Sequence, residues 1–301
     1  MDKILKVRPL EYIKQRLMRK TFNSITQKSM DIFVRGKDIG SVRPQIFGVH
    51  EEGLTKFIER TANEGNSDFF LDIGANVGLS SCQNGNSFKK VVCFEPNPLV
   101  ANILKTNLSI CLSDLCFEIC EFALGEKDGS FDMYIPRHNW GGAFVRENNR
   151  YSEDVLYKKD GFDDFDPNNY AVKTVEVKRS ETVFDSLFSS LRAEGLTKGV
   201  IKIDVEGFEK MVILSIGKTL PPELDVVIVF ENWSPNIDLN ELKNNFSDRK
   251  IVFKQFARTI TGTKKSIARK VIEFGLFGET TFIRDCTQEE VGVGDMILIV
   301  K

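Results

Sequence analysis

The chain has 301 residues, of which 42% are hydrophobic and 28% charged, and its formal net charge is −2. This length fits one large α/β domain with extra segments or two modest domains, and this composition excludes wholesale disorder. The near-neutral charge argues against a general nucleic-acid binder. No apolar run approaches the roughly 20 residues of a membrane span.

The cysteines and histidines give no sign of a metal site. The six cysteines include no Cys-x2-Cys pair, and His50 and His138 lie far apart, which argues against zinc. Cys93 and Cys120 fall in strand-like runs, where a buried thiol is the expected state. Nothing requires a disulfide framework, and the basic, polar segment 1–20 has no apolar core typical of a secretory signal. We therefore expect a cytoplasmic protein without a metal.

The first part of the chain, residues 1–66, is predicted to be a helical or capping segment ahead of a domain at 67–301. Leu10, Ile13 and Leu17 form an apolar stripe in a basic stretch. We judge this stripe to be narrow, which favours a helix packed on its own domain; a helix lying on a membrane surface is the alternative. A second helix is predicted at residues 53–64.

From residue 69 onward, short apolar runs alternate with helix-like stretches. Near-continuous apolar runs are typical of strands buried on both faces of a parallel sheet. The alternation predicts a Rossmann-like α/β sheet of seven strands, mostly parallel with the last antiparallel, and helices on both faces. The predicted strands are 69–73, 91–95, 117–124, 200–204, 226–231, 251–253 and 296–300. The predicted helices are 98–110, 209–216 and 239–246.

Two insertions interrupt this alternation, at about residues 137–172 and 257–294. Long insertions at the ends of a wound sheet often determine substrate specificity. Residues 249–272 contain eight Lys or Arg and no Asp or Glu. This basic stretch, which includes Lys264 and Lys265, indicates either an anionic acceptor or a solvated surface.

The strongest local motif is Asp72-Ile73-Gly74-Ala75-Asn76-Val77-Gly78, directly after the first predicted strand. Glycines here let the backbone approach a ligand, and the next helix would offer free N–H groups. Glu95 follows Gly74 by 21 positions, at the end of the next strand. A carboxylate there can accept both hydrogens of a ribose diol. A structural turn with a surface glutamate is the alternative interpretation.

The spacing of the motif discriminates between nucleoside cofactors. A nicotinamide dinucleotide requires Gly-x-Gly-x-x-Gly, but Asn76 and Leu79 occupy the positions of the second and third glycines. No Gly-Lys-Ser/Thr follows, so the motif is not a phosphate-binding P-loop. S-adenosylmethionine, which has a ribose but no phosphate, suits the pattern better.

Three motifs together make the sequence resemble the FkbM family of class I methyltransferases. They are Asp72 to Gly78, Phe94-Glu95-Pro96-Asn97-Pro98, and Ile201-Lys202-Ile203-Asp204-Val205-Glu206-Gly207-Phe208-Glu209. The weaker Ala123-Leu124-Gly125 and Asn139-Trp140-Gly141-Gly142 also have counterparts. The resemblance covers roughly residues 68–233, and it departs from the family in the short, polar helix after Gly78. It implies S-adenosylmethionine-dependent O-methylation of a sugar, glycan or natural product.

Carried onto this chain, the resemblance implies a set of cofactor contacts. Asp72, Gly74, Asn76 and Gly78 would line the amino-acid end of the cofactor, and Glu95 would hold its ribose. For the adenine amine the candidate is Glu121 with Phe122 beside it, although Glu121 can equally be a solvated strand-end residue. A further glutamate near His50 is expected to face the site.

Methyl transfer to a hydroxyl requires a group that takes the hydroxyl proton. The candidates are Glu206, Asp204 and His138, in that order, because the first two follow the fourth predicted strand at the crevice where open sheets bind ligands. Asp204 has an alternative role as a cofactor-amine contact or a helix cap. Asp204 and Glu206 together are also a possible oxygen-ligand pair for a divalent cation.

Three function classes follow from these observations. The first is the methyltransferase, which acts on a small-molecule or glycan acceptor. The second is a nicotinamide-dependent oxidoreductase, which lacks the required glycines. The third is a non-catalytic nucleoside-binding module, against which the intact Asp204 and Glu206 argue.

Overall fold

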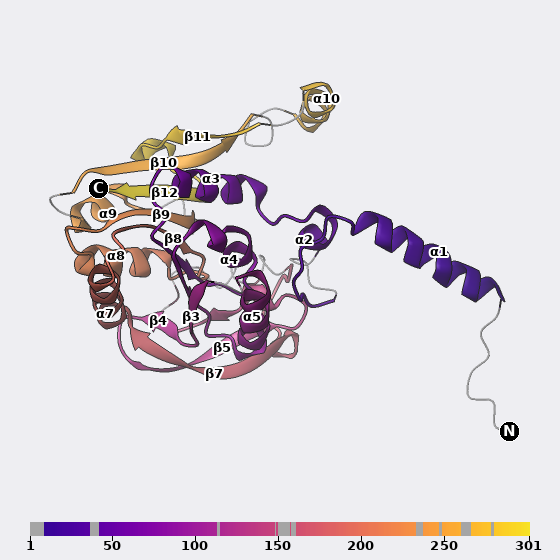
Figure 1. Cartoon of the computed structure of the whole chain (residues 1–301), viewed down its shortest axis with the longest axis horizontal. Coiled ribbons are helices and arrows are strands. Elements are labelled where there is room, and N and C mark those ends of the chain that lie inside the picture. The colour runs from indigo at the N-terminus through magenta and orange to yellow at the C-terminus, as the bar shows by residue number, and fades with distance from the viewer. Residues whose placement is uncertain are drawn as a thin grey trace.

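The computed structural model describes residues 9–36, 42–112, 115–147, 149, 157, 161–232, 237–246, 249–259, 266–277 and 280–301. Its centre is an eight-stranded sheet (Figure 1). Across this sheet the strands are β11 (Thr281–Asp285), β10 (Ile251–Arg258), β12 (Gly294–Val300), β9 (Asp225–Asn232), β8 (Lys198–Ile203), β1 (Phe69–Ile73), β2 (Lys90–Phe94) and β3 (Cys116–Cys120).

The order and direction of these strands confirm the predicted Rossmann-like fold. Strands β9, β8, β1, β2 and β3 pair in parallel, and β12 runs antiparallel between β9 and β10. The prediction of seven strands omitted β11, which lies within the predicted insertion at 257–294 and pairs antiparallel with the edge strand β10.

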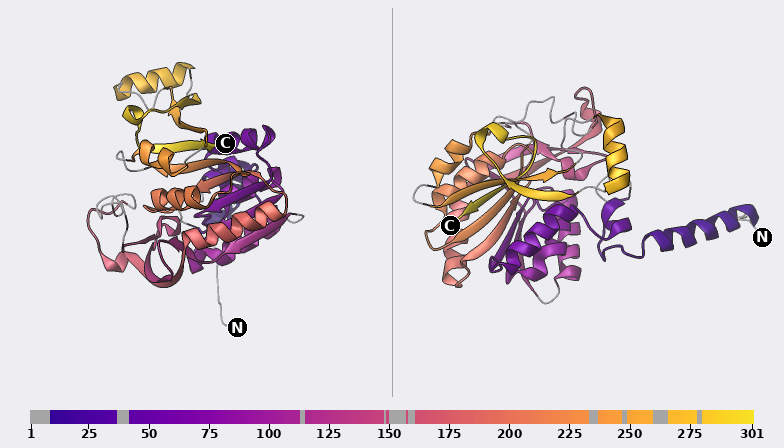
Figure 2. Two further views of the ribbon diagram at one scale, coloured as in Figure 1. Left: turned by 90° about the vertical axis from the view of Figure 1, so that its left-hand side faces the viewer. Right: turned by 90° about the horizontal axis from the view of Figure 1, so that it is seen from above.

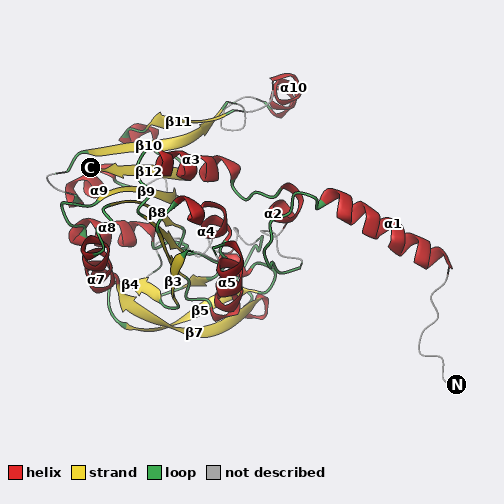
Figure 3. Ribbon diagram, in the orientation of Figure 1, coloured by secondary structure: helices red, strands yellow, loops and turns green. Residues whose placement is uncertain are grey.

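Helices cover both faces of the main sheet, as Figure 3 shows. Because side chains alternate between the two faces of a strand, Phe69 and Leu71 pack on one face and Phe70 on the other. The first face is covered by α7 (Ser180–Ala193), α8 (Glu209–Thr219) and α9 (Leu239–Asn245), and the second by α3 (Glu52–Asn63), α4 (Leu79–Asn84) and α5 (Pro98–Cys111). The three predicted helices therefore exist as α5, α8 and α9.

A second, four-stranded sheet was not predicted. Its order is β4 (Ala123–Gly125), β7 (Tyr170–Arg179), β5 (Gly129–Pro136) and β6 (Phe144–Val145). The single predicted strand at 117–124 is divided between β3 of the main sheet and β4 of this one. The predicted insertion at 137–172 connects β5 to β7, and its residues 148, 150–156 and 158–160 lie outside the described part of the chain. Short 3-10 turns complete the fold: η2 (Gly85–Ser87), η3 (Trp140–Gly142), η4 (Pro167–Asn169) and η5 (Gln288–Glu290).

Three helices precede the main sheet: α1 (Pro9–Ile25), α2 (Val42–Phe47) and α3. Helix α3 is the predicted second helix, and its Leu54 and Ile58 are buried. The expectation that the first helix packs on its own domain is wrong. Helix α1 extends away from the sheets, and Leu17 on its apolar side is 59% exposed (Figure 2). A boundary at residue 66 remains a prediction.

Two other expectations concern cysteines and membrane spans. All six cysteines are free thiols, with Cys93 fully buried and Cys120 partly buried. Within the described ranges, no helix has the length and apolar character needed to cross a membrane.

Candidate active site

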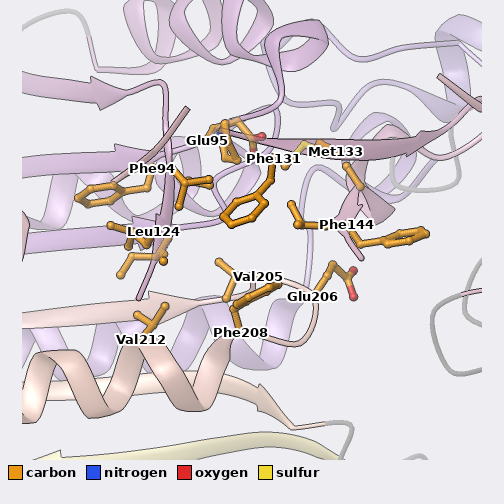
Figure 4. A pocket seen from close by; sticks show the side chains of 18 of the residues that line it. Phe94, Glu95, Leu124, Phe131, Met133, Phe144, Val205, Glu206, Phe208 and Val212 are labelled. Carbon is orange, nitrogen blue, oxygen red and sulfur yellow. The ribbon is translucent and has the colours of Figure 1, made fainter. Parts of the chain in front are cut away.

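A cavity of about 390 Å³ lies between the carboxyl ends of the main-sheet strands and the second sheet (Figure 4). Gly74, Asn76 and Glu95 line it from the loops after β1 and β2. Phe131 and Met133 line it from β5 in the second sheet. The volume is within the roughly 300–1,000 Å³ of small-molecule sites, and the strand ends are where open α/β sheets bind ligands.

The loop after β1 passes very close to β8, which explains its first glycine. Gly74 has a φ of 83°, and a Cβ atom there would lie 1.8 Å from the carbonyl oxygen of Asp204. The Gly74 and Ala75 N–H groups both donate to the Phe94 carbonyl, at 2.9 and 3.0 Å. Only glycine allows this approach, so the loop backbone is fixed at the cavity wall.

Asp72 and Gly78 belong to the same motif but do not line the cavity. Asp72 is fully buried, accepts a hydrogen bond from Ser81 Oγ at 2.7 Å, and has Lys202 Nζ at 3.4 Å. Gly78 has a φ of 87° at the start of α4, where a Cβ would meet the Leu104 side chain at 2.8 Å. Both residues therefore support the loop from behind. Helix α4 is polar in part because its Ser81 binds the buried carboxylate of Asp72.

Glu95 is 7% exposed and is held by backbone groups on both sides. Its Oε2 accepts from the Asn76 N–H at 2.8 Å, and its Oε1 accepts from the Asn97 N–H at 2.7 Å. Burial raises the pKa of Glu95 to about 7, against the lowering effect of these two hydrogen bonds. Each oxygen retains a lone pair for a second donor.

The two residues expected near the adenine behave differently. Phe122 lines the cavity and meets Phe94 edge-on at a centroid distance of 5.9 Å. Glu121 is exposed and is not part of the lining. Phe122 lines the cavity while Glu121 is exposed to solvent, so Glu121 is the solvated strand-end residue that was the alternative prediction.

Asp204 and Glu206 both line the cavity from the turn after β8. Glu206 is 8% exposed and has a φ of 45°, which is uncommon for a residue with a side chain. Its carbonyl accepts from Asn149 Nδ2 at 2.9 Å, and the same amide donates to the Val145 carbonyl at 2.8 Å. His138 lies outside the lining and packs edge-on against Phe162, at 5.0 Å between ring centroids.

Comparison with known proteins identifies the family. Residues 72–249, more than half of the chain, match the FkbM methyltransferase domain. The chain belongs to the FkbM methyltransferase family. The methyltransferase sdnD of Sordaria araneosa is 27% identical over 195 residues, which are 62% of this chain and 75% of that protein.

Solved methyltransferase structures also resemble this FkbM chain, at low sequence identity. Precorrin-6y C5,15-methyltransferase from Geobacter metallireducens is 10% identical, with a TM-score of 0.39 over 84% of this chain and 90% of that one. An O-methyltransferase from Bacillus cereus in complex with SAH is 11% identical, with a TM-score of 0.40. The match covers 99% of this chain and 93% of that one.

Membership of the FkbM family makes the chain a methyltransferase. This removes the nicotinamide-dependent oxidoreductase as an interpretation. The cavity has the features expected of a site for S-adenosylmethionine. It combines the buried carboxylate of Glu95, the backbone of Gly74 and the ring of Phe122 in one space.

The fold also brings further carboxylates near Lys202, and two of them, Glu51 and Asp295, lie outside the matched residues 72–249. Lys202 lies 3.4 Å from both Asp72 and Asp204, whose negative charges raise the pKa of Lys202 although burial opposes them. Burial raises the pKa of Asp295, and with the charges of Glu51 and Glu231 the value reaches about 7.

The carboxylates around Asp295 come from segments that lie far apart in the sequence. Glu51 precedes α3, Glu231 lies in β9, and Asp295 faces Glu231 across the β9–β12 pair. The side chain of Gln83 holds the backbone of His50, the residue before Glu51: the His50 N–H donates to Gln83 Oε1 at 2.7 Å, and Gln83 Nε2 donates to the His50 carbonyl at 3.2 Å. Glu51 is next to His50 but does not line the cavity, so a glutamate near His50 that faces the site stays a prediction. Among the described residues, no three His, Cys, Asp or Glu side chains are placed to hold a metal ion together.

Proposed function

We propose that this FkbM methyltransferase transfers a methyl group to a hydroxyl of a sugar, glycan or natural product. One observation carries the proposal: the carboxylates of Asp204 and Glu206 line the same cavity as Gly74, Asn76 and Glu95. The cavity thus has a cofactor side and, next to it, groups that can take a hydroxyl proton.

We assign the cofactor side to four residues. The backbone of Gly74 and Asn76 contacts the amino-acid end, Glu95 accepts hydrogen bonds from the two ribose hydroxyls, and Phe122 packs against the adenine. S-adenosylmethionine, when bound, supplies an electrophilic methyl group on its sulfonium sulfur. The buried site excludes water around Glu95, which strengthens its hydrogen bonds to the ribose.

On the acceptor side, we assign Glu206 as the general base. Its carboxylate would take the proton of the acceptor hydroxyl as the oxygen bonds to the methyl group and the methyl–sulfur bond breaks, with S-adenosylhomocysteine as the leaving group. The turn after β8 holds Glu206 at the cavity. Figure 4 shows that Glu95 and Glu206 reach the cavity from different elements, so cofactor binding and proton transfer are separable by mutation. Asp204 is the second candidate.

A negative charge on the acceptor remains a sequence-based prediction. Within the basic stretch at 249–272, Arg249 donates to the carbonyls of Pro221 and Leu224, and Lys254 pairs with Asp285 at 2.7 Å. These two cations therefore stabilise the fold. Lys264 and Lys265 lie outside the described residues.

Calorimetric titration with S-adenosylhomocysteine tests the assignment of Glu95. Glu95→Gln should weaken binding ~10- to 100-fold, the scale of a lost charge-assisted hydrogen bond. Because the ionised carboxylate is the better acceptor for the ribose and its pKa is about 7, wild-type affinity should fall as the pH drops below 7. The variant should lose this pH dependence.

The titration can be interpreted because the variant should remain folded and because the chain offers a matched control. Burial raises the pKa of Glu95 above its unfolded value, so this group lowers the free energy of unfolding as the pH rises toward 7. Glu95→Gln should therefore stay folded at neutral pH, because the loss of the buried charge offsets the one backbone hydrogen bond, from Asn76 or Asn97, that the amide nitrogen cannot accept. Glu121→Gln is the matched control, because Glu121 is exposed outside the cavity. Equal affinity of the Glu95 variant and the wild type would remove Glu95 from the cofactor site.

A further inference from the structure

Exposed apolar side chains gather on two helices that stand away from the sheets. Of the 17 large hydrophobic residues that are exposed in the described part of the chain, 11 lie on α1 or α10 (Ile267–Phe277). On α10 they are Ile267, Val271, Ile272, Phe274 and Leu276. Contiguous exposed apolar surface of this kind marks a site of interaction.

The apolar residues of α1 occupy one side of the helix. At 100° per residue, they span about half of its circumference. They are Leu10, Ile13, Leu17, Met18, Phe22 and Ile25, and each is between 47% and 82% exposed. Arg16, Arg19 and Lys20 lie on the opposite side. A helix with an apolar face and a basic polar face is suited to lie in the plane of a membrane interface.

Charge is distributed unevenly between these helices and the rest of the chain. Residues 1–28, which include α1, contain eight Lys or Arg and two Asp or Glu, and residues 258–277, which include α10, contain five Lys or Arg and one Glu. These two segments carry +10, and because the whole chain carries −2, the remainder carries −12. An anionic surface would attract both helices and repel the remainder, which orients the molecule.

Both helices project on the side where the parallel strands end. Figures 1 and 2 show α1 and α10 on the side opposite the C-terminus. Val300, next to the C-terminus, pairs with Val226 at the start of β9, so the carboxyl ends of the parallel strands face the two helices. The loops that line the cavity lie at these ends.

The segment after α1 is fixed to the body of the protein beside the cavity. Asn107 accepts from the Phe33 N–H at 2.7 Å and donates to the Phe33 carbonyl at 2.9 Å. The guanidinium of Arg35 lies 4.2 Å from the ring centre of Trp140, a residue of the cavity lining. Helix α1 therefore has a defined point of attachment near the cavity.

We propose that α1 and α10 form a docking surface for an anionic lipid membrane, on the side of the molecule that carries the cavity. The apolar side chains enter the interface, and the Lys and Arg side chains meet the lipid phosphates and carboxylates. Lys14, which falls within the apolar arc, can extend its stem along the surface and place its ammonium group among the headgroups.

Co-sedimentation of the full chain with lipid vesicles tests this proposal. We expect binding to phosphatidylcholine vesicles that contain about one third phosphatidylserine, with at least ~10-fold weaker binding to phosphatidylcholine alone and a loss of affinity as salt rises. Leu17→Gln with Ile25→Gln should weaken binding to the anionic vesicles by ~10-fold or more, because it removes apolar surface without changing charge. Val271→Gln with Phe274→Gln on α10 should weaken it as well.

The matched control is Gln15→Ala with Asn23→Ala, two exposed positions on the polar side of α1, which should bind as the wild type does. Thermal unfolding and S-adenosylhomocysteine affinity should be unchanged in all three variants. Failure of the wild type to bind anionic vesicles would overturn the proposal, as would undiminished binding by the Leu17 and Ile25 variant. A wild-type dimer that this variant dissociates, without vesicle binding, would instead assign the surface to a second copy of the chain.

Discussion

Glu206→Gln is expected to lower kcat by about 10²–10⁴, the usual contribution of a general base. Glutamine keeps the size and shape of the side chain but cannot take the hydroxyl proton. Because Glu206 reaches the cavity from the turn after β8 and the cofactor side is formed by other elements, affinity for S-adenosylhomocysteine should change by no more than a few-fold. Steady-state kinetics and calorimetry on the same variant separate the two effects.

Three further variants define the base. Asp204→Asn should have a smaller effect than Glu206→Gln if Glu206 takes the proton, and the reverse order would exchange their roles. His138→Asn should leave kcat nearly unchanged, because His138 packs against Phe162 outside the cavity. Asp295→Asn should also leave kcat nearly unchanged, because Asp295 does not line the cavity although its pKa is raised to about 7. Normal turnover by Glu206→Gln would contradict the proposed base.

Gly74→Ala is expected to abolish detectable cofactor binding and to lower the free energy of unfolding by ~2–5 kcal/mol. A Cβ at this position would lie 1.8 Å from the Asp204 carbonyl oxygen, and the φ of 83° is itself unfavourable for alanine. The obstacle is backbone, which cannot rotate away as a side chain can. Separation of the loop from β8 would therefore disturb both walls of the cavity. Chemical denaturation and calorimetry measure the two effects.

Gly195 provides the matched control for the backbone strain alone. It has a φ of 74°, but a Cβ there would have no atom within 4 Å. Gly195→Ala should lower the free energy of unfolding by only ~1–2 kcal/mol and leave cofactor affinity unchanged. If the two variants are equally stable and both bind S-adenosylhomocysteine normally, close packing against Asp204 is not what requires glycine at position 74.

The sequence predicted the centre of the main sheet because β1, β2, β8 and β9 are buried on both faces. Continuous apolar runs such as Phe69–Ile73 have few alternatives to a buried strand of a parallel sheet. The second sheet escaped prediction because β5 and β7 alternate buried with exposed residues and contain charged and polar side chains. The run at 117–124 was read as one strand because nothing in its sequence shows that it changes sheets.

The candidate site was predictable where a motif connects neighbouring residues, and not where the fold brings distant residues together. Gly74, Glu95 and Asp204 follow predicted strands, so the sheet places them at one edge. Burial, together with the charges of Glu51 and Glu231, raises the pKa of Asp295, and Glu51 precedes it by more than 240 residues. Leu10, Ile13 and Leu17 alone form a narrow apolar stripe, which predicts a packed helix, whereas Met18, Phe22 and Ile25 widen the apolar face of α1 to a surface that is exposed.

Transfer of an isotopically labelled methyl group from S-adenosylmethionine tests the central claim most directly. The chain is incubated with the labelled donor and an extract of host glycans and metabolites, and mass spectrometry locates the label. We predict a labelled methyl ether on a hydroxyl oxygen, formed by the wild type and greatly reduced with Glu206→Gln. Label on nitrogen or carbon would contradict O-methylation, and cofactor binding without transfer to any acceptor would indicate a non-catalytic module.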